Sequence, residues 1–313
     1  MDDRNAIMDK ALLKDLLQLE KTSSRHRDFC EEQYSRRFGK IIAPFIENKI
    51  EFSEVMLKTE TYISGSLALL FFDPDFYAND AKTDKHDMDL YTTSDGITAL
   101  LVYLIQKEGY CVQEPDGFYS ERRTTTSRFY FRSRRQTGIK KIYKLQKGEL
   151  KIDVIESSGE HAFVSILHFH FTIPMNALNP VEFISFYPSF TMYGAGMFSE
   201  KSFVRGFDPN GYGERLLKDN VKAACAKYER RGFCIKESPN SLERSHAASC
   251  LFGACRQVRY VDDCQTLRVN FGKAKRPTLP TNIVIRWSLG GYKCGGHYSD
   301  AEYCPFFVDV LSL

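Results

Sequence analysis

The chain has 313 residues, of which 43% are hydrophobic and 27% are charged. This balance is typical of a globular protein and excludes collagen-like, coiled-coil and wholly disordered chains. The formal net charge is only +3, but residues 122–151 hold 11 Lys or Arg and one acid, so that stretch carries +10 and the other 283 residues carry −7.

The apolar runs of the chain are short. Ala99–Ile105 is among the longest, well below the ~20 residues that a membrane-spanning helix needs. The first residues include Asp2, Asp3 and Arg4 and show no signal-peptide core. We therefore expect a cytoplasmic or nuclear protein that does not contact a membrane.

Apolar spacing predicts alternating helices and strands along the chain. A turn at Gly65–Ser66 separates the first predicted strand from an apolar helical run, and Gly109 and Gly232 follow two predicted helices as C-cap residues. Helices are predicted over 5–20, 25–38, 67–72, 97–107 and 214–231, and strands over 61–64, 86–92, 127–132, 141–146, 150–155 and 282–288. The alternation predicts an α/β or α+β core.

Nine cysteines are present. Without an export signal, buried reduced thiols are the favoured interpretation and a disulfide framework is not expected. A structural Zn²⁺ site in the C-terminal part is an alternative that is not favoured, because its spacing lacks paired CxxC knuckles. The residues concerned are Cys234, Cys250, Cys255, Cys264, Cys294, Cys304, His246 and His297.

Two carboxylates occur close together in the predicted strand over 86–92. In a strand, side chains alternate between the two faces, so Asp87 and Asp89 point the same way while Met88 and Leu90 point to the core. Two like charges about 7 Å apart repel each other unless a cation lies between them, and Mg²⁺ prefers such oxygen ligands. The pattern predicts a site for a divalent metal ion.

A third carboxylate, Asp153, lies in the middle of the apolar strand predicted over 150–155. Asp is depleted in strands, so its place there is unusual. If this strand is a neighbour of the one with Asp87 and Asp89, the three carboxylates can hold one or two Mg²⁺, as in metal-assisted phosphoryl transfer. Asp153 would then also accept the proton of an acceptor hydroxyl. The Gly65–Ser66 turn supplies backbone N–H groups and a hydroxyl that can bind a phosphate.

This order of motifs resembles the nucleotidyltransferase (polymerase-β-like) superfamily, whose signature is a Gly-Ser turn at a helix start, then h-D-h-D-h, then a later h-D-h strand. Four segments are similar to a group of uncharacterised fungal nucleotidyltransferase-like proteins, and His168–Asn176 matches an apolar stretch of that group. The similar segments are Tyr62–Phe72, Asp87–Tyr91, Lys151–Ile155 and Lys227–Phe233. The resemblance covers about residues 60–235, and the 21-residue interval from Ser66 to Asp87 is longer than usual in the superfamily.

The resemblance implies roles for individual residues. Gly65 and Ser66 match the phosphate-binding turn, and Asp87, Asp89 and Asp153 match the catalytic metal ligands for Mg²⁺ or Mn²⁺. In such enzymes a lysine on a later helix often contacts the triphosphate, which makes Lys218 and Lys222 candidates for nucleotide binding. Tyr91, on the same strand face as Asp89, is a candidate for stacking on the base.

Together these features predict an α+β fold whose nucleotidyltransferase-type core, over 60–235, is a mixed sheet flanked by helices. A helical segment over 1–59 precedes the core, and a Cys-rich part over 236–313 packs on it. The expected activity is Mg²⁺-dependent transfer of a nucleotidyl group from an NTP to a hydroxyl acceptor, with release of pyrophosphate. The alternatives are a non-catalytic nucleotide- or nucleic-acid-binding module, and a cyclic-dinucleotide or oligonucleotide synthase. The basic stretch 122–151 predicts contact with phosphates, either of a triphosphate or of an RNA or DNA partner.

Overall fold

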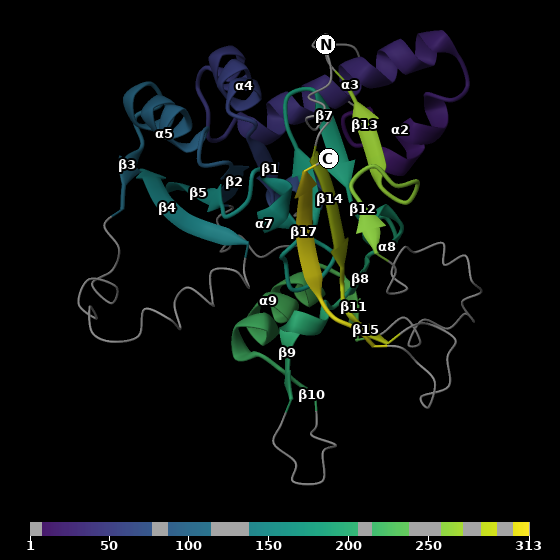
Figure 1. Cartoon of the computed structure of the whole chain (residues 1–313). Coiled ribbons are helices and arrows are strands. Elements are labelled where there is room, and N and C mark those ends of the chain that lie inside the picture. Colours follow the sequence, from purple (N-terminus) through teal and green to yellow (C-terminus); the bar gives the residue numbers. More distant parts are fainter. Residues whose placement is uncertain are drawn as a thin grey trace, which may run out of the picture. The chain divides into compact units, whose positions relative to one another are not determined.

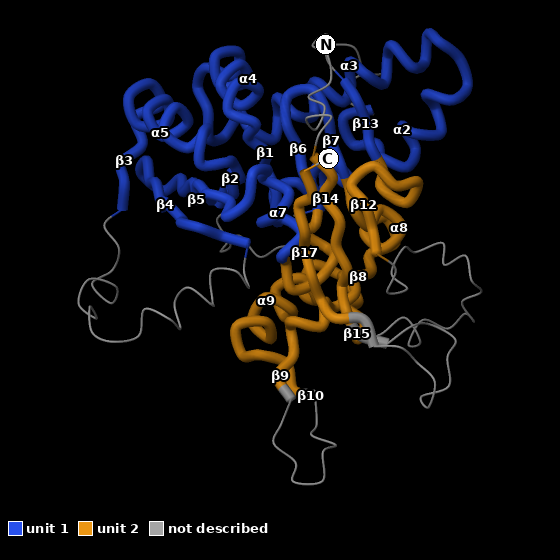
Figure 2. The backbone as a smooth tube through the Cα atoms, in the orientation of Figure 1, with its two compact units in different colours: residues 1–168, 176–184, 268–279 blue, residues 169–175, 185–267, 280–313 orange. Residues whose placement is uncertain are grey.

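In this computed structural model the described residues are 8–76, 87–113, 138–205, 215–237, 258–271, 283–292 and 303–312. The chain divides into two compact units (Figure 2). Unit 1 consists of residues 1–168, 176–184 and 268–279, and unit 2 consists of residues 169–175, 185–267 and 280–313. The chain thus passes between the units several times.

Unit 1 is built on one mixed sheet in which eight strands lie in the order β13-β7-β6-β1-β2-β5-β4-β3 (Figure 1). Strands β2 and β5 are parallel, whereas β1 pairs antiparallel with β2 and with β6, and β4 pairs antiparallel with β5 and β3. The bounds are β1 Tyr62–Ser64, β2 Met88–Thr92, β3 Cys111–Val112, β4 Ile139–Lys147, β5 Leu150–Ser157, β6 Asn176–Leu178, β7 Glu182–Ser185 and β13 Leu267–Asn270.

Six helices accompany this sheet within the described residues of unit 1. They are α2 Leu13–Leu19, α3 Ser24–Ile42, α4 Lys49–Lys58, the 3₁₀ helix η1 Leu67–Phe71, α5 Ile97–Gln106 and α7 Phe163–Ile166. Helix α3 begins where the Ser23 hydroxyl accepts a hydrogen bond from the His26 N–H at 3.2 Å. Helices α4 and α5 contact each other, and α5 also contacts β5 (Figure 1). The predicted mixed sheet flanked by helices is confirmed.

Aromatic side chains from distant parts of the sequence form the core between η1 and the sheet. The ring of Phe71 stacks on Phe183 with centroids 4.5 Å apart and on Phe271 at 5.4 Å. Tyr34 of α3 adds a ring 5.9 Å from Phe71. All four side chains are buried, so the N-terminal helices and the strands around residues 183 and 271 share one hydrophobic core.

One buried acid in unit 1 is fully compensated. The carboxylate of Glu182 has 0% exposure, accepts a hydrogen bond from the Tyr62 hydroxyl at 3.1 Å and pairs with the Arg268 guanidinium at 3.0 Å. A buried charge is tolerated when a partner of opposite charge and hydrogen bonds replace water. This cluster therefore ties β1 to β7 and β13 and belongs to the scaffold.

Unit 2 contains several small sheets. Strand β14 lies between β12 and β17, β8 pairs with β11, β9 pairs with β10, and β15 pairs with β16. Its elements are α8 Pro188–Thr191, β8 Ala195–Met197, η2 Glu200–Ser202, β9 Phe203–Arg205, β10 Arg215–Leu217, α9 Asp219–Arg230, β11 Cys234–Lys236, β12 Arg259–Tyr260, β14 Ile283–Ser288, β15 Gly291–Tyr292, β16 Tyr303–Cys304 and β17 Phe307–Ser312. Trp287 of β14 is fully buried and donates a hydrogen bond to the Tyr187 hydroxyl at 2.8 Å.

The observed elements differ from the predicted ones at particular places. The helix predicted over 214–231 begins only at Asp219, because residues 215–217 form β10 opposite β9. The helix predicted over 5–20 is α2, over Leu13–Leu19. The strand predicted over 127–132 lies outside the described residues. The predicted segment boundaries at 59/60 and 235/236 do not coincide with the limits of the two units, since α3 packs on η1 and unit 1 includes residues 268–279.

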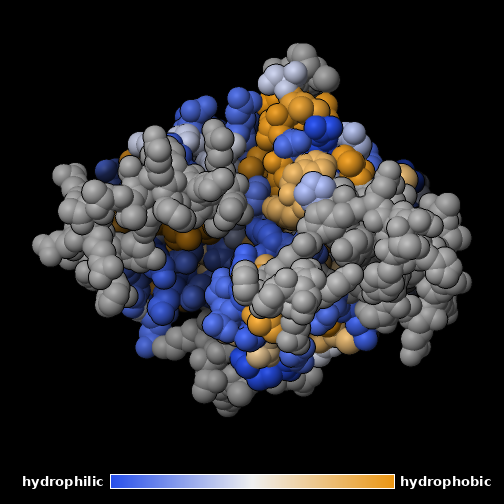
Figure 3. Space-filling model, turned by 60° about the horizontal axis from the view of Figure 1, so that its bottom comes forward, coloured by the Kyte–Doolittle hydropathy of each residue, from blue (hydrophilic) through white to orange (hydrophobic). Residues whose placement is uncertain are grey.

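Within the described residues, no helix combines the length and apolar character needed to cross a bilayer. One face of the molecule shows hydrophilic areas beside smaller hydrophobic ones (Figure 3). The exposed apolar side chains of the described surface include Val204 and Leu216, which are paired across β9 and β10 and are each 46% exposed.

Candidate active site

Four neighbouring strands of unit 1 each place one residue in a row across the sheet. Ser64 of β1 is paired with Asp89 of β2. Asp89 is in turn paired with Asp153 of β5, and Asp153 is paired with Lys144 of β4. Directly paired residues point to the same face of a sheet, and adjacent strands are about 4.8 Å apart. Asp89 and Asp153 are therefore immediate neighbours. We call these four residues the carboxylate row.

The opposite face of the same strands is apolar and closed to water. Met88 and Leu90 on β2, and Ile152 and Val154 on β5, all have 0% exposure. Because side chains alternate along a strand, burial of these four directs Asp89 and Asp153 to the other face. The alternation in both segments was predicted from the sequence, and the structure meets the condition that the two strands are neighbours.

The Gly65 turn lies directly against the carboxylate of Asp89. A Cβ atom built on Gly65 would fall on the Asp89 Oδ2 atom, closer than non-bonded atoms can approach, and Gly65 has φ +69. Only glycine combines this backbone conformation with the required space. The turn that follows β1 is therefore adjacent to the carboxylate row, and Ser66 comes next in the chain as the N-cap residue of η1.

Charge and burial act on Asp153 in opposite directions. Partial burial raises the pKa of Asp153, and the charge of Asp87 raises it further, whereas the ammonium groups of Lys144 and Lys151 lower it. The net effect is a pKa above the ordinary value. A carboxylate with a raised pKa is a better proton acceptor than an exposed one, and its dependence on Asp87 indicates that the two acids are close enough to interact.

The acids of the row and the nearby Asp87 are of the residue types that hold a divalent metal ion. Asp89 and Asp153 are paired neighbours, and Asp87, which is exposed just before β2, interacts electrostatically with Asp153. Carboxylate oxygens are what Mg²⁺ and Mn²⁺ prefer, so the residue types fit. Among the described residues, however, no group of three His, Cys, Asp or Glu side chains surrounds one point closely enough to hold a metal ion. A shared ion at these three acids stays a prediction.

Tyr91 lies on the same face as Asp89 but is not accessible. Its side chain is 5% exposed, and its cross-strand partner Tyr62 is covered by Phe163 of α7, with ring centroids 4.8 Å apart. Helix α7 also contacts β2 and β5. This short helix packs at the Tyr62 and Tyr91 end of the carboxylate-bearing face, whereas Asp87 is exposed and Asp89 is half-buried. Tyr91 is thus a buried side chain in this structure, and its base-stacking role stays a prediction.

Lys218 and Lys222 belong to unit 2. Lys218 is the N-cap residue of α9, and its ammonium donates a hydrogen bond to the Lys201 carbonyl oxygen at 2.5 Å. Lys222, in the first turn of α9, forms an ion pair with the exposed Asp219 at 2.9 Å. Their predicted contact with a triphosphate stays a prediction.

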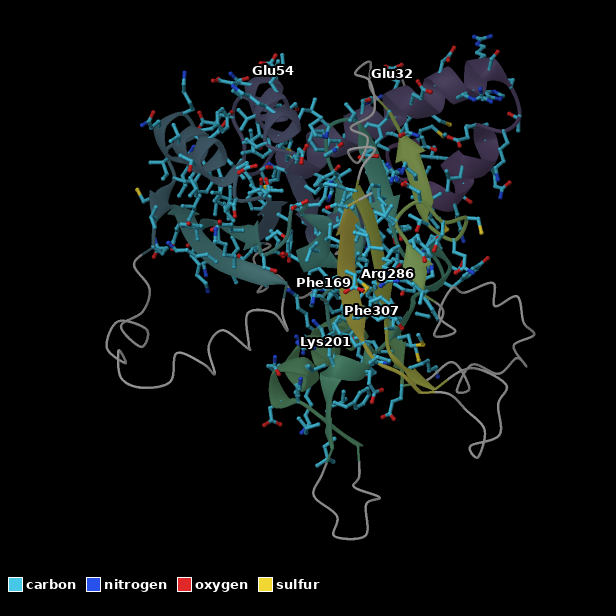
Figure 4. The ribbon with its side chains drawn as sticks, viewed as in Figure 1. Glu32, Glu54, Phe169, Lys201, Arg286 and Phe307 are labelled. Carbon is cyan, nitrogen blue, oxygen red and sulfur yellow. The ribbon has the colours of Figure 1, made fainter. Side chains whose placement is uncertain are left out.

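The structure brings together three basic residues of unit 2 that sequence reasoning did not group. Burial and the charge of Lys218 lower the pKa of Lys201 to about 7. Burial together with the charges of Lys201 and Lys218 lowers the pKa of His170 to about 4. We call Lys201 (labelled in Figure 4), Lys218 and His170 the lysine cluster. Its members are separated by 17 residues or more, so no local pattern could have revealed it.

The basic stretch 122–151 is only partly described, because residues 122–137 lie outside the described residues. Its remainder forms the hairpin of β4 and β5, on which five lysines lie: Lys140, Lys141, Lys144, Lys147 and Lys151. The part of the stretch that is described is therefore attached to the carboxylate row.

The cysteines within the described side chains are free. Cys30 and Cys225 are buried, and Cys111, Cys234 and Cys264 are exposed. Most of the residues proposed for a structural zinc site lie outside the described side chains: Cys250, Cys255, Cys294, Cys304, His246 and His297. A structural zinc site in the C-terminal part therefore remains an alternative that is not favoured.

Comparison with known proteins finds no match for this chain: no protein-family model matches it, no curated protein is similar to it, and no solved structure resembles it.

Proposed function

We propose that this chain is a Mg²⁺-dependent nucleotidyltransferase that transfers a nucleotidyl group from an NTP to a hydroxyl acceptor. The observation that carries the proposal is the direct pairing of Asp89 with Asp153 on parallel strands, next to the Gly65 turn. Two acids on neighbouring strands repel each other, and a folded protein retains such a pair at a cost unless a cation or a proton is shared. A nucleotidyl-transfer site needs a bound cation and a group that accepts a proton.

Asp87, Asp89 and Asp153 would hold the metal, and Mg²⁺ when bound supplies positive charge for the triphosphate and lowers the pKa of the acceptor hydroxyl. The partly buried Asp153 accepts the proton of that hydroxyl, consistent with its raised pKa. In the reaction the acceptor oxygen forms a bond to the α-phosphorus, the bond from the α-phosphorus to the bridging oxygen breaks, and pyrophosphate leaves with that oxygen.

The Gly65–Ser66 turn orients the triphosphate in this proposal. Gly65 lets the backbone approach Asp89 closely, so a phosphate bound by the turn lies beside the row. Backbone N–H groups and the Ser66 hydroxyl are suitable donors to phosphate oxygens. Holding the reacting groups in place is itself a large part of catalysis in phosphoryl transfer.

The first experiment measures pyrophosphate release from each labelled NTP with Mg²⁺ or Mn²⁺, with and without RNA or double-stranded DNA. Asp89→Asn and Asp153→Asn should each lower the rate by more than the about 10–100-fold that loss of an outer metal-site partner costs. Asp95→Asn is the matched control, because Asp95 is an exposed acid just after β2, and its rate should equal that of the unmodified chain. Circular dichroism verifies that the variants fold.

Two results would overturn the proposal. One is unchanged pyrophosphate release in both row variants. The other is no release from the unmodified chain with any NTP and acceptor while nucleotide or nucleic acid still binds, which is the behaviour of a non-catalytic binding module.

A further inference from the structure

The lysines of the β4–β5 hairpin differ in what neutralises them. Lys140 pairs with Glu156 at 2.7 Å, and Lys147 pairs with Glu47 at 2.6 Å. The ammonium of Lys141 lies over the Tyr143 ring, 4.2 Å from its centroid. These three lysines thus have partners within the fold.

Lys144 and Lys151 are different. Both are exposed, and within the described part of the chain neither has a carboxylate at ion-pairing distance. Lys144 is the direct cross-strand partner of Asp153, and Lys151 precedes Asp153 by two residues on β5. Both lysines therefore lie on the carboxylate-bearing face. Their charges act on Asp153 without forming an ion pair with it.

The order of the strands puts these lysines on one particular side of the acids. The Gly65–Ser66 turn follows β1, and the row then passes through β2 and β5 to β4. Three strand spacings separate β1 from β4, which is about 14 Å. A triphosphate held by the turn lies on the β1 side of the acids, so Lys144 and Lys151 lie on the side from which the acceptor must approach.

The surroundings of the two lysines fit a nucleic-acid strand better than a small anion. Lys151 is paired with Gln146, so Lys144 and Lys151 are diagonal neighbours on adjacent strands, about 7–8 Å apart at their backbones. Long flexible side chains at that separation can contact successive phosphates of one strand. Ile142, on the same face, is 44% exposed and offers an apolar surface to a base.

We propose that Lys144 and Lys151 bind backbone phosphates of the acceptor, and that this acceptor is a single-stranded oligonucleotide. The proposal rests on the proposed function for its account of which side the acceptor occupies. It adds to that function a substrate class and two residues that position the acceptor. The lysines take no part in bond making; they hold the strand so that its terminal hydroxyl reaches the acids.

The test measures the binding of a fluorescein-labelled 20-nucleotide RNA to the full chain. Fluorescence anisotropy reports the affinity at a series of salt concentrations. The double variant Lys144→Gln/Lys151→Gln should bind roughly tenfold more weakly near 0.1 M salt. The slope of log affinity against log salt should fall in magnitude by about 1.4, as expected for two lost contacts to a single strand. Lys141→Gln, on the same strand but the opposite face, is the matched control and should change neither quantity.

A second arm measures the affinity of the same variants for ATP, for GTP and for a mononucleotide 5′-phosphate. Unchanged NTP affinity in the double variant supports the acceptor assignment. RNA binding that is equal in the double variant and the control would overturn the inference, and so would an equal loss of NTP and RNA affinity, which would place the lysines at the triphosphate.

The two proposals fail separately. Binding needs no catalysis, so lysine-dependent RNA binding without pyrophosphate release would remove the nucleotidyltransferase proposal and keep the RNA-binding surface. Pyrophosphate release that is insensitive to both lysines, with RNA binding likewise unchanged, would keep the enzyme and remove the surface.

Discussion

The carboxylate row of unit 1 and the lysine cluster of unit 2 both gather charged groups, but they do so in opposite environments. In the row, Lys144 lies beside the two acids and is exposed, as are the nearby Asp87 and Lys151. The charges of Lys144 and Lys151 lower the pKa of Asp153 and oppose the rise that burial causes.

The lysine cluster contains groups of one sign only. Lys201 loses most of its contact with water, and its ammonium lies 5.0 Å from the centroid of the Phe306 ring. The nearby charge of Lys218 adds repulsion, and the pKa of Lys201 is lowered to about 7. Burial and a nearby like charge both disfavour the protonated form of a lysine. The comparison teaches that exposure, more than the number of charges, decides whether the groups of a cluster keep their charge.

The largest effect is expected from Gly65→Ala, which disturbs the carboxylate row. The new Cβ would collide with the Asp89 carboxylate and displace it. A displacement of about 1 Å in a reacting group can cost about 100-fold in rate, so pyrophosphate release should fall by that order. Gly109→Ala is the control, because Gly109 has φ +76 but no atom within 4 Å of a built Cβ.

Backbone strain is similar in these two variants, and only Gly65→Ala adds the collision. Equal rates in both would show that the contact between Gly65 and Asp89 does not matter for activity. Equal thermal stability with unequal rates would sharpen the assignment of the row to catalysis.

The next effect is on stability and comes from Lys201→Met in the lysine cluster. Between pH 7 and about 10.4 the folded chain leaves Lys201 neutral while the unfolded chain protonates it. The unfolded state then binds more protons, so the free energy of unfolding rises with pH across this window, by up to about 1.4 kcal/mol per pH unit. Below pH 7 Lys201 is protonated in both the folded and the unfolded chain. The burial of its ammonium then lowers the free energy of unfolding by its full amount.

Lys201→Met should remove that rise and make unit 2 more stable at pH 6 than the unmodified chain. Urea unfolding followed by the fluorescence of Trp287, the single tryptophan of the chain, reports on unit 2 directly. An identical pH dependence in the two proteins would contradict the buried like-charge description of the cluster.

The smallest effect is expected from Lys218→Met. Loss of its hydrogen bond to the Lys201 carbonyl should cost about 1 kcal/mol. Removing its charge also raises the pKa of Lys201, so the rise of stability should begin at a higher pH. Lys222→Met is the control: its pair with Asp219 is exposed and should contribute within about 0.5 kcal/mol. If the stability of Lys218→Met begins to rise at the same pH as that of the unmodified chain, Lys201 and Lys218 do not interact.

Much of the site was predictable because its signals are local. Alternation places Asp87 and Asp89 on one face and Met88 and Leu90 on the other, and burial of the latter pair confirms it. The strand around Asp153 and the glycine turn at Gly65 are read from a few adjacent residues in the same way.

Other features depend on which distant segments meet. Tyr91 carries the same alternation signal as Asp89, yet it is buried because Phe163 of α7 lies over its partner Tyr62. The difference between Lys141 and Lys144 likewise comes from the register of β4 against β5, since both look alike in a run of basic residues. A shift by one residue would exchange their faces.

The sequence by itself determined the apolar and polar faces of the strands, the strained glycine turn and the three acids in their order, because each follows from residues within a few positions of one another. Only the tertiary structure decided that Asp89 and Asp153 are paired, that Lys144 lies beside them, and that Lys201, Lys218 and His170 meet in a desolvated place. Strand pairing and burial are contacts between segments tens of residues apart, and their energies depend on partners that no local pattern names.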